Sequence, residues 1–532
     1  MILFLIFTLL HISVSYGATI AIIDTGFDLD HDYLRPKILN KETDEEAIDY
    51  YGWDFFDNNH MKTPVIEDKS SVQEILLFRN LRAKGHKQGL SLEEFDWFKK
   101  KSADKEFMEK VKLFRKHVHG TFVAGIALRQ GENINIFPIR GLNIPNPVVA
   151  VEDNSTEGSL PLKGKTAEAK FHEEIRHSID RVSKKFNKIC RFVSKKNIEI
   201  VNASYGITFK NIMTKFRERY KEMTGKEIGE TKLKIVVDDY FRILYERGEK
   251  TMKRHPNILF VFSAGNSGLN NDEFHHYPSR IKVPNAITVA AMNGDYLATF
   301  SNYGLNRVDV GAPGVAILSL VPKVYSDDGS DLYSPSSGTS MAAPYVSNLA
   351  AQIKNTNAKL TPPEIKRIIL ETGELKSHLK TRLASGAIVN NHKAIRAALL
   401  SKDMGLAESI QLGNSDLIQM EDKISIGISP AISPELPSVI TPEEVDDLVV
   451  TDITRSESSE QKDQEKEQPD NSKQLPLKEK DAPVKSSDQD LSSQSAERFL
   501  KPSADLPASS SEPQLKQAPA QNPATSPSSP ES

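Results

Sequence analysis

Three short segments each carry one residue of a type that serves in nucleophilic catalysis. Asp24 ends the run AIID, His119 stands in the string His-Gly-Thr, and Ser340 follows Gly-Thr. A serine hydroxyl is a weak nucleophile until a neighbouring base removes its proton. An imidazole titrates near neutral pH and can take that proton and return it to a leaving group, while an acid holds its tautomer. Together the three residue types predict acyl transfer to water through an acyl-enzyme.

The surrounding sequence predicts where each of these residues lies. Asp24 follows the buried-type strand 19–23, and open parallel sheets place their sites at the carboxyl ends of strands. His119 and the small apolar residues after it are expected to open a helix. The glycine before Ser340 and the Met-Ala-Ala-Pro after it predict a second helix start, where backbone N–H groups lack partners within the helix. Pro344 is expected in the first turn of that helix, where a missing N–H is tolerated.

Short apolar, β-branched runs alternate with helical stretches along residues 18–400, which is typical of an α/β domain. Continuous apolar runs favour a parallel sheet covered by helices on both faces. Two charged helical stretches, about 62–117 and 145–255, are expected as insertions at the rim of the domain. Residues 163–254 carry 24 Lys/Arg against 13 Asp/Glu, which predicts either an exosite for an acidic partner or a solvated face. The clearest strands are 19–23, 134–139, 198–202, 258–263 and 286–290.

The acid, the histidine and the serine follow one another in the chain order of subtilisin-type triads. Several further strings occur in the order in which that family has them. The sequence therefore resembles the subtilisin-like serine proteases, or subtilases, from about residue 20 to residue 398. The resemblance implies a three-layer α/β fold with a mainly parallel, twisted sheet. The strings are NASYG at 202–206, SAGNSG at 263–268, YPS at 277–279, FSNYG at 300–304, DVGAPG at 309–314 and SGAIVNNHKAI at 385–395.

The resemblance also implies roles for residues at matching positions. Asp24, His119 and Ser340 match the catalytic triad, and Asn266 matches the asparagine of the oxyanion hole. The tetrahedral oxyanion would then lie between the Asn266 amide and the backbone N–H of Ser340. An extended peptide would pair with backbone on two sides, as an added strand does. The residues implied in substrate binding are Ser204, Tyr205, Gly206, Ser263, Ala264 and Gly265.

Neighbouring residues compete for these roles. The rivals are His117 for the base, Asp28 and Asp30 for the acid, and Ser337 for the nucleophile. The strings around the first-named residues match the family, so they are preferred. An aspartic-protease interpretation needs two Asp-Thr-Gly strings, whereas the sequence has one. The resemblance places His276 near the specificity pocket, where it and His275 would favour an acidic or polar substrate side chain or be ordinary loop residues.

The two ends of the chain differ from the domain between them. An apolar stretch over 2–10 is followed by small residues, which is typical of a signal peptide of residues 1–17, although no Lys or Arg precedes Arg35. The first expected strand follows at once, so no folding prodomain fits between them: the fold would assemble unaided, a basic insertion or the tail would substitute, or the true start would lie upstream of Met1. The proline-bearing stretch 401–450 is expected to be a linker, and the Ser/Pro-rich stretch 451–532 a disordered tail.

These features predict an exported serine endopeptidase, secreted or in the cell envelope, that acts on proteins or peptides. Two alternatives stay open: a catalytically silent subtilase-fold binding or scaffold protein, and an intracellular processing protease whose first residues are not a signal. The formal net charge of -4 gives no reason to expect nucleic acid. A membrane partner is expected only if the apolar N-terminal stretch stays uncleaved, and the oligomeric state is not predicted.

No cofactor is assigned from the sequence. Cys190 is the one cysteine, which excludes an intrachain disulfide and a cysteine-rich zinc site. Subtilases often bind calcium, so the resemblance raises a structural calcium ion, and the acidic loop 326–331 is the candidate. Its residue order lacks the spacing of an EF-hand, and no metal ligand is named.

Overall fold

The structure is a computed structural model that describes residues 17–39, 52–55, 59–60, 71–141, 166–326 and 332–415. All of them belong to one compact unit of the chain, Met1–Gln464. The expected tail, residues 416–450 of the expected linker and residues 1–16 of the expected signal peptide lie outside the described residues, as do residues 327–331 of the candidate calcium loop. Within the described ranges, no helix is long and apolar enough to cross a membrane.

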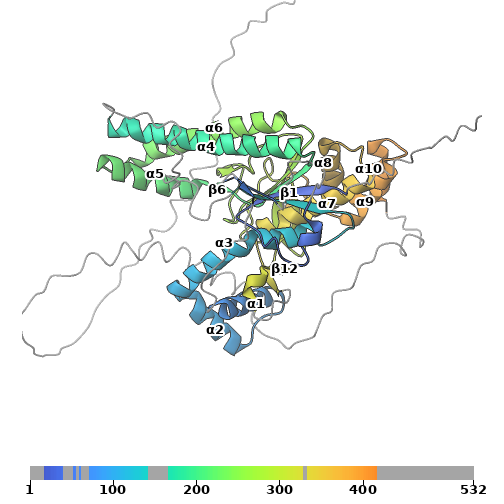
Figure 1. The fold of residues 1–532 in the computed structure, drawn as a ribbon, viewed down its shortest axis with the longest axis horizontal. Helices are drawn as coiled ribbons and strands as arrows, with labels where there is room; N and C mark the ends of the chain where they lie inside the picture. Colours follow the sequence, from blue (N-terminus) through green and yellow to red (C-terminus); the bar gives the residue numbers. More distant parts are fainter. Residues whose placement is uncertain are drawn as a thin grey trace, which may run out of the picture. The chain divides into compact units, whose positions relative to one another are not determined.

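A mainly parallel sheet forms the centre of the described structure (Figure 1). Its strands run in the order β14-β15-β11-β9-β7-β5-β1-β4-β2-β3, and β10 pairs with β9. Neighbours from β15 to β2 pair in parallel, whereas β14–β15, β2–β3 and β9–β10 are antiparallel. The strands are β1 (Thr19–Asp24), β2 (Trp53–Asp54), β3 (Asn59–His60), β4 (Asn135–Arg140), β5 (Ile200–Ala203), β7 (Leu259–Ser263), β9 (Ala286–Asn293), β10 (Tyr296–Leu297), β11 (Val310–Pro313), β14 (Glu374–Leu375) and β15 (Ala387–Ile388).

The five strands expected from the sequence are β1, β4, β5, β7 and β9, which confirms the α/β fold class. Two antiparallel pairs lie outside the main sheet. They are β12 (Ile317–Val321) with β13 (Leu332–Ser336), and β6 (Ile207–Thr208) with β8 (His276–Tyr277).

Both faces of the sheet are covered, because side chains alternate along each strand. In β1, Ile20 and Ile22 belong to one buried cluster and Ala21 and Ile23 to another, and all four are at most 1% exposed. This is why the strand reads as a continuous apolar run. The first cluster includes residues of α3 (Lys105–Ala127), α7 (Thr339–Thr356), α8 (Pro362–Glu371) and α9 (Asn391–Leu400); the second includes residues of α4 (Ala167–Lys195), α5 (Phe209–Thr224) and α6 (Glu230–Lys253).

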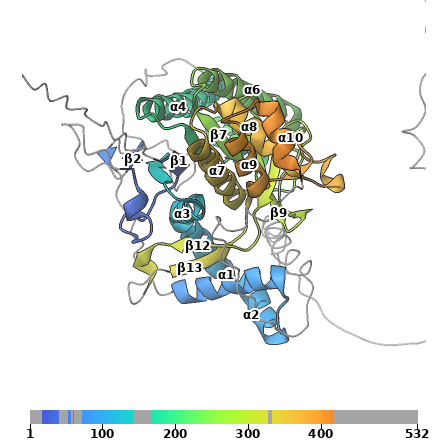
Figure 2. The same cartoon turned by 90° about the vertical axis from the view of Figure 1, so that its right-hand side faces the viewer.

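The first charged stretch folds into α1 (Val72–Lys87), α2 (Leu92–Ser102) and the first half of α3. These helices share a buried cluster, in which the rings of Phe78 and Phe98 stack with centroids 4.6 Å apart. Figure 2 shows α1 and α2 near β12 and β13. The expectation that His119 opens a helix is wrong. The insertion supplies an N-cap, Asp104, and a helical run that continues unbroken past His119.

The second charged stretch folds into α4, α5 and α6, which Figure 1 shows gathered on one side of the sheet. These helices are more than rim insertions, because they supply the cover of one sheet face. The apolar side chains of α4 recur at helical spacing on its buried side. Phe186 of α4 packs against Phe260 of β7 with ring centroids 6.0 Å apart. Residues 142–165 of this insertion lie outside the described residues.

The packed domain extends beyond the expected boundary at residue 400. Residues Leu406–Asn414 form α10, which lies against α9 (Figure 2). Ile410 is 5% exposed and belongs to the same buried cluster as β1. The prolines that suggested a linker all lie after residue 415, so they carry no information about residues 401–415. The first part of the expected linker is therefore part of the domain.

Candidate active site

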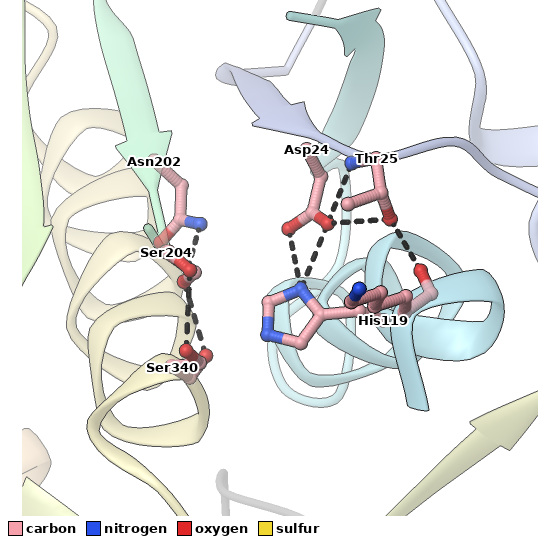
Figure 3. A network of polar contacts seen from close by, with 7 residues as sticks. Asp24, Thr25, His119, Asn202, Ser204 and Ser340 are labelled. Carbon is pink, nitrogen blue, oxygen red and sulfur yellow. Dashed lines mark hydrogen bonds and ion pairs between the residues drawn. The ribbon is translucent and has the colours of Figure 1, made fainter. Parts of the chain in front are cut away.

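Asp24 and His119 form a close pair at the carboxyl end of β1. His119 Nδ1 lies 2.8 Å from Oδ1 and 2.9 Å from Oδ2 of Asp24 (Figure 3). The Asp24 side chain is fully buried and that of His119 is 18% exposed. A carboxylate accepts hydrogen bonds, so Nδ1 carries the proton and Nε2 keeps a lone pair. Figure 3 shows Nε2 facing the side on which Ser340 lies.

The residues that follow Asp24 fix it against the helix that carries His119. The Thr25 backbone N–H donates to Asp24 Oδ1 at 2.8 Å, and the Thr25 hydroxyl donates to the carbonyl of Lys116 in α3 at 2.7 Å. Gly120 allows α3 to approach, because a Cβ there would lie 2.1 Å from the carbonyl oxygen of Gly26. The glycine of the His-Gly-Thr string is therefore required by the contact between the strand end and the helix.

Ser340 is the second residue of α7, which begins directly after Gly338. Its backbone N–H lies in the first turn and has no acceptor within the helix. Its hydroxyl donates to the backbone carbonyl of Ser204 at 3.1 Å, and the Ser204 hydroxyl donates to the Ser340 carbonyl at 3.0 Å. The two serines thus bind each other reciprocally across β5 and α7.

The reciprocal bond explains how a proline is tolerated in α7. The expectation that Pro344 lies in the first turn is wrong, since Pro344 stands inside the helix. In a regular helix the N–H of residue 344 would donate to the carbonyl of Ser340, four residues earlier. Proline has no such N–H, and the Ser204 hydroxyl supplies the missing donor instead.

The same polar contacts continue into the buried interior. Asn202 of β5 donates from Nδ2 to the Ser204 hydroxyl at 3.0 Å and accepts from the Ser347 hydroxyl of α7 at 3.0 Å. All three side chains are nearly or fully buried. Buried polar groups are costly unless they are hydrogen-bonded, so this set fixes the start of α7 relative to β5.

The structure brings Asp24 and His119 together, and it brings Ser340 to the same end of the sheet. The Ser340 hydroxyl bonds Ser204 rather than His119 among the described residues. A rotation about the Cα–Cβ bond of Ser340 changes the direction of its hydroxyl without moving the backbone.

Asn266 follows β7 and lies beside the start of α7. Its Oδ1 accepts from the backbone N–H of Thr339 at 2.8 Å and from the Thr339 hydroxyl at 2.9 Å. The residue is exposed, and no described residue accepts from Nδ2. With Oδ1 held by two donors, the NH₂ group has a fixed direction and is available to an incoming acceptor.

The rival residues have other surroundings. His117 lies two residues before His119 and therefore on a different side of α3. Asp28 accepts from the backbone N–H groups of Asp30 and Lys323, so its carboxylate stabilises the loop after β1. The Ser337 hydroxyl accepts from the backbone N–H of Ala316 at 2.9 Å. None of these contacts joins a rival to the Asp24–His119 pair.

The two expected substrate segments differ in the backbone groups they leave open. At Tyr205 and Gly206, no described residue binds the backbone N–H or carbonyl. At Ala264 and Gly265, by contrast, the N–H groups donate to the Val289 carbonyl at 2.9 Å and to the Thr339 hydroxyl at 3.1 Å. Of these two segments, 204–206 therefore presents N–H donors without a partner among the described residues. In the segment 263–265, the N–H groups of Ala264 and Gly265 already have acceptors and are not available to a peptide.

Sequence reasoning missed three supporting residues. Thr25 ties β1 to α3, Thr339 holds both the Asn266 amide and Gly265, and Asn302 binds the backbone N–H groups of residues 267 and 269. All three stand inside the quoted strings, but the strings alone do not say what their side chains contact.

Among the described residues, no group of three or more His, Cys, Asp or Glu side chains could hold a metal ion. The candidate calcium loop lies outside the described residues except for Ser326.

Residues 15–395 match the family model described as the subtilase family. This match covers well over half of the chain, and the chain therefore belongs to the subtilase family. Relatives include an extracellular basic protease of Dichelobacter nodosus, 36% identical over 147 residues, and the alkaline elastase YaB of Bacillus sp. (strain YaB), 34% identical over 156 residues. The aligned parts are 26% and 28% of this chain.

The aligned parts span 23% and 37% of the length of these two relatives. Among solved structures, a lanthipeptide protease is 17% identical with a TM-score of 0.42, covering 71% of this chain and 89% of that chain. A cold-adapted subtilisin-like serine proteinase is 20% identical with a TM-score of 0.34, covering 69% of this chain and 88% of that chain.

Proposed function

We propose that this protein is a serine endopeptidase that hydrolyses peptide bonds through Asp24, His119 and Ser340. The observation that carries the proposal is the bidentate contact between His119 Nδ1 and the buried Asp24 carboxylate, with the start of α7 at the same end of the sheet. Membership in the subtilase family supports it. The substrates are proteins or peptides.

In the proposed reaction, the Ser340 hydroxyl turns from Ser204 to Nε2 of His119. The proton passes to Nε2 while Oγ attacks the carbonyl carbon, forming a C–O bond and moving the carbonyl π electrons onto oxygen. The N–H of Ser340 and the Nδ2–H of Asn266 donate to that oxyanion. As the intermediate collapses, the C–N bond breaks and His119 returns the proton to the leaving amine.

Water completes the cycle by the same route. His119 takes a proton from water as the water oxygen attacks the acyl carbon, and the C–O bond to Ser340 then breaks. The proton on His119 returns to Oγ, which restores the serine. Asp24 stabilises the imidazolium in both steps and does not itself become protonated.

Labelling with a fluorophosphonate, which reacts with an activated serine, tests the assignment. We expect the wild-type chain and the matched control Ser337→Ala to be labelled, and Ser340→Ala to stay unlabelled. Labelling that persists in Ser340→Ala would refute the nucleophile. Folded wild-type protein that takes no label would favour the catalytically silent scaffold. No observation on the described residues favours that alternative.

We also propose export of the protein through residues 1–17. The apolar N-terminal stretch supports this proposal, and one of the relatives is named as an extracellular protease. N-terminal sequencing of the mature protein should begin at residue 17, 18 or 19. A mature chain that keeps Met1 would contradict a cleaved signal and leave two interpretations, the intracellular processing protease and an uncleaved membrane anchor.

A further inference from the structure

The imidazole of His276 lies between two glycines that flank the candidate active site. A Cβ at Gly206 would lie 2.1 Å from Cε1 and 2.3 Å from Nε2 of His276. A Cβ at Gly265 would lie 2.8 Å from the same Nε2 and 2.9 Å from Cδ2. The edge of one ring therefore contacts both glycines and fills the space between the two backbone segments.

Both segments also contact the start of α7. The Ser340 hydroxyl lies 3.1 Å from the Ser204 carbonyl, two residues before Gly206. The Gly265 N–H lies 3.1 Å from the hydroxyl of Thr339, the residue before Ser340, and Gly265 directly precedes Asn266. If Ser340 is the nucleophile, as proposed above, we expect the substrate carbonyl between Ser340 and Asn266. The side chain of the residue before the cleaved bond is attached to the carbon next to that carbonyl, so it begins within reach of these two segments.

The His276 ring is fixed in its place. Residue 276 is 4% exposed, and β8 pairs with β6 so that His276 lies opposite Thr208. Its Nδ1 lies 2.6 Å from the Ser279 hydroxyl, which also lies 3.2 Å from the His276 carbonyl. Moving the ring aside would break its hydrogen bond to Ser279 within a close-packed interior. Displacement of the ring by a bulky substrate side chain would therefore cost free energy.

The ring is also uncharged at neutral pH. Burial lowers the pKa of His276 to about 4. A charge on His276 therefore gives no reason to expect an acidic substrate side chain, whereas the expected preference for a polar side chain stays a prediction. Nε2 of His276 has no hydrogen-bond partner among the described residues. The space between Gly206 and Gly265 therefore contains one neutral polar atom.

We propose that His276 closes the substrate pocket to large side chains, so that this enzyme cleaves after glycine, alanine or serine. The neighbouring His275 cannot do the same. Its ring stacks on Phe241 with centroids 4.9 Å apart, and its Nε2 lies 3.2 Å from Asp238. His275 is therefore directed toward α6, and it offers a matched control.

The test is a series of peptides that differ only in the residue before the cleaved bond: Gly, Ala, Ser, Leu, Phe or Glu. For the wild-type enzyme we expect kcat/KM for Ala to exceed that for Phe by about 10- to 100-fold, the range in which pocket size discriminates side chains. His276→Gly should raise kcat/KM for Phe at least about tenfold and reverse the order. His275→Ala should leave the Ala/Phe ratio unchanged.

Fluorophosphonate labelling of each variant separates the two proposals. A wild-type enzyme that is labelled at Ser340 yet cleaves after Phe or Glu as well as after Ala overturns the role of His276 and leaves the proposed function intact. Absence of label on folded wild type overturns both. If His276→Gly does not fold, His276→Ala replaces it, and the preference of the wild type alone decides the proposal.

Discussion

One neighbour, Thr339, fixes the orientation of the Asn266 side-chain amide. Thr339 donates twice to Oδ1, through its backbone N–H and its hydroxyl, and this fixes the direction of the NH₂ group. A donor that is oriented before the reaction stabilises developing charge without reorganisation. Asn266 is exposed, so the same NH₂ group does little for the stability of the fold.

Replacement of Asn266 by alanine should therefore reduce turnover much more than substrate affinity. We expect kcat to fall about 10²- to 10³-fold, the size that a subtilisin itself shows on losing such a donor, with KM nearly unchanged. Steady-state kinetics on one peptide substrate measures both. Ser267→Ala, at the adjacent exposed position, should keep the wild-type kcat. Equal turnover in Asn266→Ala and Ser267→Ala would remove Asn266 from the oxyanion hole.

At the level of elements, the site depends on how β5 is joined to α7. A proline inside α7 leaves the Ser340 carbonyl without its helical donor, and the Ser204 hydroxyl takes that place. The helix thus gains a contact with the sheet at Ser340, the proposed nucleophile. Asn202 and Ser347 extend the contact inward, so the orientation of the first turn is set by buried hydrogen bonds rather than by the helix alone.

This arrangement predicts coupling between Ser204 and Pro344. Ser204→Ala should lower the free energy of unfolding by about 1–3 kcal/mol, because the partly buried Ser340 carbonyl loses its donor. In a Pro344→Ala background, the new N–H can donate to the same carbonyl. The cost of Ser204→Ala should then fall by about 1 kcal/mol. Urea unfolding of the four chains, all carrying Ser340→Ala to prevent self-cleavage, measures the difference.

Ser267→Ala in both backgrounds serves as the control, since its hydroxyl makes no hydrogen bond among the described residues. Its effect should be small and the same with proline or alanine at position 344. Strictly additive costs of Ser204→Ala and Pro344→Ala would show that Ser204 does not substitute for the helical donor.

For the molecule as a whole, the two charged insertions are structural parts of the described domain. Part of the basic charge of α4, α5 and α6 is met by acids on neighbouring helices: Arg219 lies 2.7 Å from Glu174, and Arg217 lies 2.6 Å from Glu230. Exposed pairs of this kind contribute little to stability. Because residues 163–254 carry 24 Lys/Arg against 13 Asp/Glu, an excess of basic charge remains, and both the solvated helical face and the exosite for an acidic partner stay predictions.

Two truncations should locate the end of the domain. A chain that ends after Ser415 should keep the full free energy of unfolding, because the composition of the residues that follow predicts a linker and a disordered tail. A chain that ends after Met404 should lose about 2–4 kcal/mol, since it exposes the surface that α10 covers. Both chains carry Ser340→Ala, and urea unfolding compares them. Equal stability of the two truncated chains would show that α10 is not part of the packed domain.

The sequence by itself determined the class of fold, its main strands and the chemistry-bearing residues. Continuous apolar runs predicted β1, β5 and β7, because strands buried on both faces admit few other residues. Asp24, His119, Asn266 and Ser340 were predicted because the strings around them resemble those of the subtilase family. One glycine of these strings, Gly120, is explained by the tertiary contact of α3 with Gly26.

Only the tertiary structure decided how those residues are held. The tolerance of Pro344 inside α7 depends on the Ser204 hydroxyl, which comes from a strand far away in the chain. The place of His276 also depends on distant contacts. Its ring lies between Gly206 and Gly265, which are 70 and 11 positions away, because β8 pairs with β6 across that distance. No local pattern encodes such a meeting, since it arises from packing rather than from the spacing of residues.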